Sequence, residues 1–257
     1  MYISIIYRGC ILMIKKITKE KEVVSSLTDC RLSMGLLETQ SVIQDNMCDF
    51  FQEIGADGVR MVPIKNCFFV VTKSKIVFTK KLTWQDKFSA TSEVSSMTRL
   101  KVNLCTELTS EEGLVAVCVQ EMVAIDADKR TPCLVASTLF PLDLECGKKC
   151  DLDFERMVVD IEDSCYVGSH VVDVTNIDFY KHTNNMEYIR FMLTTLDLDY
   201  VLTHDIESFE IHYIAESRFG DELKIYRKEI DDGYYFQINN GEKVVVKARM
   251  CFSKDCK

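Results

Sequence analysis

The sequence predicts an α+β protein in which one unit, a long helix followed by antiparallel strands, occurs twice. Apolar residues at helical spacing fill the segments 36–54 and 186–196, and segments rich in β-branched and aromatic residues follow each. The halves also match residue by residue, with Ile76 over Ile211, Phe78 over Tyr213, Trp84 over Phe219 and Asp86 over Asp221. A chain of 257 residues suits two cores of about 100–150 residues each. A match over such a distance indicates duplicated domains rather than a solenoid.

The first half begins with the helix over 36–54. The apolar face of this helix is formed by Ile43, Met47, Phe50, Phe51 and Ile54. Gly55 follows at a position where a helix normally stops. Strands are predicted over 67–79, 87–106 and 113–125, with a turn at residues 111–113 before the last strand.

The second half repeats this order. A strand over 170–175 precedes the helix, for which Asn184 is a suitable N-cap and Glu187 completes a capping box. The apolar face of the helix is formed by Met186, Ile189, Met192, Leu193 and Leu196. Strands are predicted over 208–216, 221–230, 233–239 and 242–252. The sequences Asp-Asp-Gly at 231–233 and Asn-Asn-Gly at 239–241 predict tight hairpins, because Gly and Asn tolerate positive φ.

A helix followed by four or five antiparallel strands is the layout of a hot-dog domain, in which a curved sheet wraps a long helix. One such sheet cannot bury both its helix and its edges well, so two units usually pair side by side. The sequence therefore predicts a tandem double hot-dog on one chain. We place an N-terminal extension at 1–22, the first domain at 23–140, a linker at 141–164 and the second domain at 165–257. Met13 offers an alternative start, which makes the residues before it an upstream extension.

Composition excludes several classes of protein. With 47% hydrophobic residues the chain is not predominantly disordered, and a net charge of −9 argues against nucleic-acid binding. The apolar first fourteen residues are too few to span a membrane. Of the twelve cysteines, Cys67, Cys105, Cys118 and Cys251 lie in apolar runs, as expected for core thiols in a reducing, cytoplasmic compartment. Neither of the closest cysteine pairs has the two-residue gap of a zinc knuckle, and the four histidines do not pair at helical spacing. No nucleotide or Gly-x-Ser-x-Gly motif occurs, so we expect no cofactor.

The polar segment 178–185 precedes the second helix and is the best candidate for chemistry. If Asn184 caps that helix, Asp178 and His182 lie in the loop at its N-terminus, where partial positive charge can polarise a carbonyl. A histidine and a carboxylate there form a plausible acid–base couple for activating water. The alternative is an ordinary turn and cap. We take the segment 40–47 as the corresponding stretch of the first half, and it contains no histidine, so the polar set belongs to one half only.

The motif Asp178-x-x-x-His182-x-Asn184-Asn185 resembles the active-site segment of acyl-acyl carrier protein (acyl-ACP) thioesterases, whose pattern is Asp-x-Asn-x-His-x-Asn-Asn. The segment 212–217, His-Tyr-Ile-Ala-Glu-Ser, is similar to the family's second motif, a strand ending in Glu-Cys. Segments 82–86 and 123–132 resemble parts of the family's N-terminal hot dog. The resemblance extends over about residues 28–252, which is most of the chain.

The resemblance implies hydrolysis of the thioester between a fatty acyl chain and acyl carrier protein, a step of fatty acid biosynthesis. Asp178 and Glu216 would activate water or act on the thioester carbonyl, while His182 would orient the thioester and shuttle protons. The chain departs from the family at Tyr180, in place of Asn, and at Ser217, in place of Cys. Losing the Cys argues against an obligatory thiol nucleophile. Tyr180, Asn184 and Ser217 are assigned to substrate binding, beside the catalytic set.

Three further points stay open from sequence. The carrier could be coenzyme A rather than acyl carrier protein, or the protein could be a non-catalytic regulator that binds acyl thioesters, a role that Tyr180 favours. The chain could also form a homodimer. Met47 and Phe51 on the first helix could line an acyl tunnel, the alternative being ordinary core packing.

Overall fold

The computed structural model describes residues 16–148, 150–159 and 161–253, so Met13, Cys10 and Cys256 lie outside the described residues. The chain divides into two compact units. Of the described residues, those up to 22 and those within 42–72 and 87–152 form the first unit, and those within 23–41, 73–86 and from 153 to 253 form the second. Helix α1 (Leu36–Glu53) begins in the second unit and ends in the first, whereas strand β2 (Cys67–Phe78) runs the other way.

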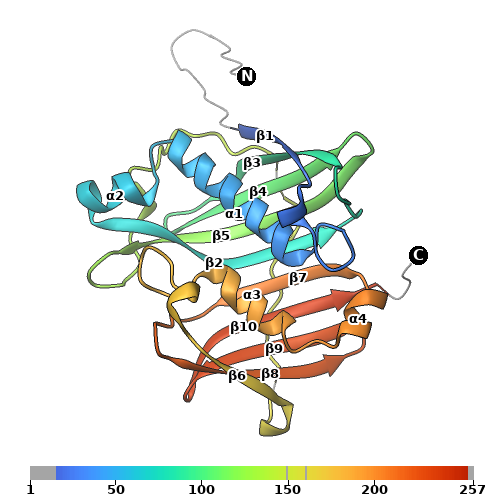
Figure 1. Cartoon of the computed structure of the whole chain (residues 1–257). Helices are drawn as coiled ribbons and strands as arrows, with labels where there is room; N and C mark the ends of the chain where they lie inside the picture. Colours follow the sequence, from blue (N-terminus) through green and yellow to red (C-terminus); the bar gives the residue numbers. More distant parts are fainter. Residues whose placement is uncertain (1–15, 149, 160, 254–257) are drawn as a thin grey trace. The chain divides into compact units, whose positions relative to one another are not determined.

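In the first unit, an antiparallel sheet carries the C-terminal part of α1 on one face (Figure 1). Its strands are β1 (Lys16–Glu22), β3 (Lys87–Met97), β4 (Lys101–Ser110) and β5 (Gly113–Asp126), in the order β1-β3-β4-β5. Phe50 and Phe51 of α1 pack against Val94 of β3, Leu104 of β4 and Met122 of β5. The predicted apolar face of the first helix therefore forms the core of this unit.

In the second unit, the helix α3 (Asn185–Leu193) lies in front of strands β10, β9 and β8 (Figure 1). The strands are β6 (Tyr166–Val171), β7 (Ile206–Tyr213), β8 (Glu222–Ile230), β9 (Gly233–Asn240) and β10 (Lys243–Phe252). They follow the order β7-β10-β9-β8-β6, and residues 73–77 of β2 pair antiparallel with β7. Met186, Ile189 and Met192 of α3 are buried, as predicted for the helical face, but the helix ends at Leu193, so the predicted face residue Leu196 lies beyond it.

The two halves of the chain follow the same strand order. From the edge strand inward, the first half reads β1-β3-β4-β5-β2 and the second reads β6-β8-β9-β10-β7. Each strand of the first half thus has a counterpart in the second, and a helix precedes the last four strands in both halves. The hot-dog layout of a helix on an antiparallel sheet is therefore present.

Three predicted strands are wrong in their bounds: the one predicted at 208–216 is β7, Ile206–Tyr213, and the other two meet a turn. The segment 87–106 contains two strands, β3 and β4, because Thr98 turns the chain: its hydroxyl oxygen accepts from the N–H of Lys101 at 3.1 Å. The predicted strand 170–175 is shifted, since β6 ends at Val171 and Asp173 caps a 3₁₀ turn over Val174–Asn176. Both turns are made by side-chain oxygens of Thr or Asp, without the Gly or Pro that commonly marks a turn.

One strand and two α-helices were not predicted. Residues 16–22, assigned to the N-terminal extension, form β1 and pair with β3. This strand has Ile17 as its only apolar residue, so it shows no alternation. Helices α2 (Gly58–Lys65) and α4 (Leu198–Thr203) are too short to display a helical period, and α2 contains Pro63. In the described part of the chain, no helix combines the length and apolar character needed to cross a membrane.

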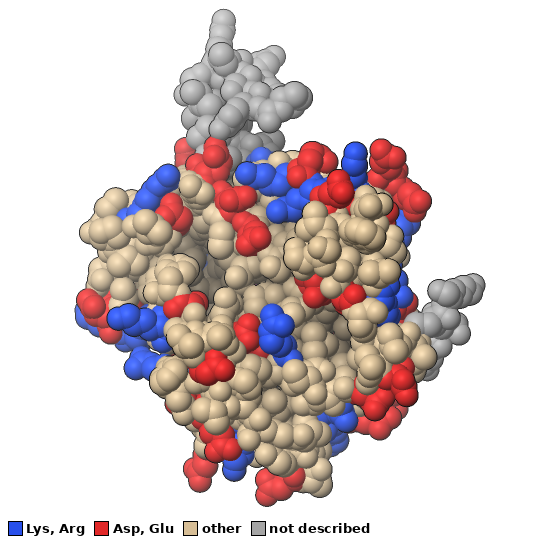
Figure 2. All heavy atoms as spheres, in the orientation of Figure 1, with Lys and Arg blue, Asp and Glu red and all other residues tan. Residues whose placement is uncertain are grey.

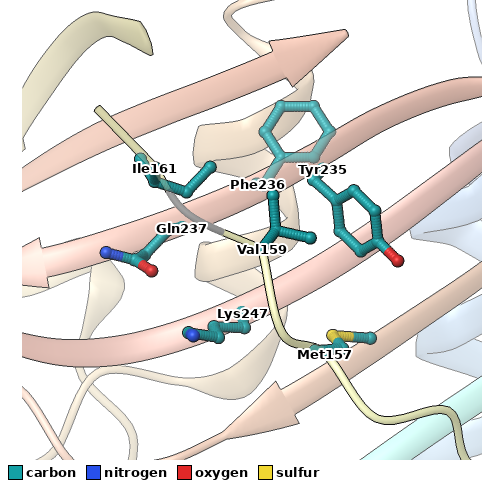
Figure 3. A pocket seen from close by; sticks show the side chains of 7 residues that line it. All are labelled: Met157, Val159, Ile161, Tyr235, Phe236, Gln237 and Lys247. Carbon is teal, nitrogen blue, oxygen red and sulfur yellow. The ribbon is translucent and has the colours of Figure 1, made fainter. Parts of the chain in front are cut away.

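The linker in the second unit covers one face of the sheet. Met157, Val159 and Ile161 lie over β9 and β10 and, with Tyr235 and Lys247, border a small hollow (Figure 3). Ion pairs and a backbone hydrogen bond hold this segment. The N–H of Glu155 donates to buried Glu210 at 2.8 Å, and the Glu155 carboxylate pairs with Arg249 at 2.6 Å. The linker is therefore a bound part of the unit.

Four of the cysteines are core residues. Cys67, Cys105, Cys118 and Cys251 are buried free thiols, as predicted from the apolar runs around them. Burial raises the pKa of the Cys67 and Cys251 thiols, which keeps them protonated and unreactive near neutral pH.

The two predicted hairpins of the second half are present, and one of them needs glycine for steric reasons. A Cβ on Gly233, at φ +151°, would lie 2.0 Å from the carbonyl oxygen of Met250, whereas a Cβ on Gly241, at φ +57°, would meet nothing within 4 Å. We expect Gly233→Ala to lower the free energy of unfolding by about 3 kcal/mol and Gly241→Ala by about 1 kcal/mol. Urea denaturation checks this, and equal losses for the two variants would contradict it.

Candidate active site

The loop before α3 is shaped by Asp178. Its Oδ1 accepts the N–H groups of Tyr180 at 2.9 Å and His182 at 3.2 Å, and its own N–H donates to the His182 carbonyl at 2.8 Å. Lys181 adopts a left-handed conformation, φ +67°, which closes the turn. Asp178 thus bonds the backbone of His182 and fixes the position of its Cα, from which the imidazole extends.

The helix cap is confirmed, but the capping box is wrong. Asn184 Oδ1 accepts from the N–H of Met186 at 3.0 Å. The Glu187 carboxylate accepts instead from Asn176 Nδ2 at 2.8 Å, and the N–H of Asn184 donates to the Asn176 carbonyl at 2.8 Å. Asn176 is buried and also contacts His170 through its Oδ1. The fold thus supplies a partner, Asn176, that occupies both groups the box would have joined.

The structure brings His182 and Glu216 together. His182 Nε2 lies 3.2 Å from Glu216 Oε2, and the side chains are 13% and 40% exposed. Glu216 was predicted at a strand end, but β7 ends at Tyr213, so the carboxylate projects from the following loop. The pair lies beside the N-terminus of α3, whose dipole stabilises negative charge. This arrangement can hold a water molecule, remove its proton and stabilise an oxyanion.

The two departures from the family pattern have different surroundings. The Tyr180 ring contacts that of Phe179 in a tilted arrangement, with centroids 4.0 Å apart and planes at 39°. Ser217 is completely buried, and its Oγ lies 2.6 Å from Thr183 Oγ1 and 2.7 Å from Tyr188 Oη. Ser217 therefore belongs to a buried hydroxyl cluster that also includes Thr183 and Tyr188. Neither of these two was singled out from sequence for a role in the site, because their hydroxyls converge only through the fold.

Met47 and Phe51 belong to the first unit. Phe51 is 6% exposed, and its ring lies 5.1 Å from that of Phe69 and 6.1 Å from that of Phe140. Met47 is partly buried against the same cluster. These contacts are those of core packing, and a role in acyl binding stays a prediction.

The first half contains a counterpart of the loop before α3, at a position other than the segment 40–47 that was compared from sequence. Asp29 Oδ1 accepts the N–H groups of Arg31 at 2.8 Å and Ser33 at 3.3 Å, and the Asp29 N–H donates to the Ser33 carbonyl at 2.7 Å. Leu32 has φ +58°. Asp29, Arg31, Leu32 and Ser33 therefore match Asp178, Tyr180, Lys181 and His182 in turn.

The counterpart has no equivalent of the His182–Glu216 pair. Ser33 stands at the position of His182, and Lys81, by the matched strands, at that of Glu216. Arg31 binds Asp29 at 3.0 Å and Asp205 at 2.7 Å, and Lys81 also pairs with Asp205. Ion pairs thus occupy this loop. The sequence match missed it because the distance between the loop and the matched strand differs in the two halves.

Residues 162–254 match the model of the acyl-ACP thioesterase C-terminal domain, which contains every residue of the proposed catalytic set. The match covers the C-terminal part of the chain, just over a third of its length.

Solved structures show the same fold. An acyl-ACP thioesterase from Bacteroides thetaiotaomicron is similar with a TM-score of 0.83 and 20% identity, over 93% of this chain and 98% of that one. A 12:0-ACP thioesterase from Umbellularia californica is similar with a TM-score of 0.82 and 14% identity, over 93% and 97%. No curated protein sequence matches the chain.

Proposed function

We propose that the protein hydrolyses fatty acyl-ACP thioesters and releases free fatty acids. The observation that carries this proposal is the His182–Glu216 pair, 3.2 Å apart, within the domain that the family model matches. In the proposed reaction the pair removes a proton from water, and the hydroxide attacks the thioester carbonyl. The tetrahedral intermediate then expels the carrier thiolate, which takes the proton back from His182. Water is the only co-reactant.

Asp178 would complete the catalytic set, and the N-terminus of α3 would stabilise the oxyanion. Asn184 fixes that terminus by accepting from Met186. Tyr180 is proposed to border the thioester, whereas the complete burial of Ser217 makes the substrate-binding role predicted for it unsuitable. The loops that bear the pair each carry an exposed cation, Lys181 and Arg218, which suits an anionic carrier. Elsewhere, basic and acidic side chains are interspersed on the face drawn in Figure 2.

The proposed architecture is a tandem double hot-dog with domains at 23–140 and 165–257 joined by the linker 141–164. The repeated strand order supports this. So do two matching pairs of backbone bonds. In the first half, the N–H of Val23 donates to the Asp86 carbonyl, and the Val23 carbonyl accepts from the N–H of Gln85. In the second half, Val172 makes the same two bonds with Asp221 and Gly220. A cytoplasmic location is proposed from the buried free thiols.

The carrier is tested by offering the same acyl chain on acyl carrier protein and on coenzyme A. We expect faster hydrolysis, by kcat/KM, of the carrier-protein thioester. A preference for coenzyme A would assign the alternative carrier. Binding of acyl-ACP with no turnover of either thioester, under conditions where the chain is folded, would make the protein a regulator. His182→Ala is the matched control for background hydrolysis, and sedimentation of the same sample tests the homodimer.

The proposed role of helix α1 in acyl binding is tested by the chain length of the released fatty acids. We expect Met47→Ala and Phe51→Ala to shift released fatty acids toward longer chains, because each removes side-chain volume from an apolar core that an acyl chain could enter. One methylene in such a slot is worth about 10–200-fold in discrimination. Fatty-acid profiling of each variant, beside a stability measurement, checks this. Unchanged profiles for alanine at positions 43, 47, 50 and 51 would make α1 a scaffold only.

A further inference from the structure

Three buried hydroxyl groups connect the segments that carry the acid–base pair. Ser217 is 0% exposed, Tyr188 2% and Thr183 4%. The Ser217 hydroxyl contacts both of the others, at 2.6 Å for Thr183 and 2.7 Å for Tyr188. Burial raises the pKa of Tyr188, so its phenol stays protonated and can donate to this cluster. The cluster thus holds a tyrosine on α3, a threonine before it and a serine on the loop after β7.

Each loop member of the hydroxyl cluster directly follows one member of the acid–base pair. Thr183 follows His182, and Ser217 follows Glu216. The two loops are joined by a backbone bond from the N–H of Thr183 to the carbonyl of Ser217, 2.9 Å long, and by the hydroxyl contact beside it. The position of one loop relative to the other, and therefore of the imidazole relative to the carboxylate, depends on this junction.

The first half contains the same backbone junction between two loops that lack the histidine and the glutamate. There the N–H of Met34 donates to the carbonyl of Leu82 at 2.8 Å, which is the counterpart of the Thr183–Ser217 bond. Met34 and Leu82 are 6% and 4% exposed and apolar, and they follow Ser33 and Lys81 rather than a histidine and a glutamate. The backbone junction therefore forms with apolar side chains at the counterparts of Thr183 and Ser217, and hydroxyls stand at these two positions only beside His182 and Glu216.

We propose that Thr183, Tyr188 and Ser217 act as positioning residues that hold His182 and Glu216 at their working separation. This inference rests on the proposed function. Directional hydrogen bonds fix the junction more narrowly than apolar contacts do, because they specify angles as well as distances. The half-exposed Glu216 needs such support, since a misplacement of about 1 Å can cost on the order of 10²-fold in rate.

The kinetic test removes one hydroxyl at a time. Tyr188→Phe and Thr183→Val each lose an O–H with little change in volume, and we expect kcat to fall about tenfold with KM nearly unchanged. Thr183→Ser keeps the hydroxyl and should restore kcat. Thr39→Val is the matched control. Thr39 is fully buried at the counterpart of Tyr188 and bonds the Gly35 carbonyl at 2.7 Å, so its loss should lower stability and leave kcat unchanged.

A second readout separates this inference from the proposed function. The chain has four histidines, so the ¹⁵N resonances of the His182 ring can be assigned by their loss in His182→Ala. Tyr188→Phe and Thr183→Val should shift these resonances, and Thr39→Val should not. If the wild type cleaves no thioester, the proposed function fails. The His182 resonances still test the positioning role in that case, because they do not depend on turnover. Unchanged His182 resonances and unchanged kcat in folded Tyr188→Phe and Thr183→Val overturn it.

Discussion

Replacing His182 with alanine is expected to lower kcat/KM for acyl-ACP about 10²–10⁴-fold, the usual cost of removing a positioned acid or base. The imidazole lies 3.2 Å from the Glu216 carboxylate, so removing either side chain leaves the other without its partner. Glu216→Ala should therefore cost a similar factor, and the double variant little more, because the two act as one unit. Steady-state kinetics on the two single variants and the double variant measure this.

Ser217→Ala is the control for the Glu216 variant, since it changes the adjacent residue in the same loop. Its expected loss is about tenfold, that of one hydroxyl of the cluster, and much milder than that of Glu216→Ala. An inactive Ser217→Ala beside an active Glu216→Ala would mean that the motif is assigned one residue out. Near-normal turnover by folded His182→Ala would remove the acid–base pair from the mechanism altogether.

Asp178→Asn is the second substitution with a large expected effect. The carboxylate holds the loop by accepting two backbone N–H groups through Oδ1, and an asparagine Oδ1 can accept the same bonds. The variant therefore keeps the turn and loses the negative charge. If that charge takes part in catalysis, kcat/KM falls about 10²–10⁴-fold while the unfolding transition stays near that of the wild type.

The first half supplies the matched control for this variant. Asp29 makes the same turn, with bonds to Arg31 and Ser33, and lies in the loop that lacks a histidine. Asp29→Asn should weaken the pairing with Arg31 and reduce stability modestly, with hydrolysis retained. Wild-type rates for Asp178→Asn would assign Asp178, like Asp29, to shaping its loop only.

Much of the fold follows from local patterns in the sequence. The predicted first helix, 36–54, lies within a residue of α1, and the hairpins before Gly233 and after Asn240 are present. These elements carry strong local signals, a helical apolar period or a glycine turn. The bounds failed where the local signal was polar. Thr98 ended β3, and Asp173 began a 3₁₀ turn in what was predicted as a strand.

The candidate site divides in the same way. The sequence by itself determined the repeated helix-and-strand order, the Asn184 cap and the choice of Asp178, His182 and Glu216, because each depends on nearby residues or on a motif. Only the tertiary structure decided three other things. It placed His182 beside Glu216 and gathered the hydroxyls of Thr183, Tyr188 and Ser217 behind them. It also matched the loop at Asp29 to the loop at Asp178. These relations join segments far apart in the chain, and their geometry comes from strand register and buried hydrogen bonds that no local pattern specifies.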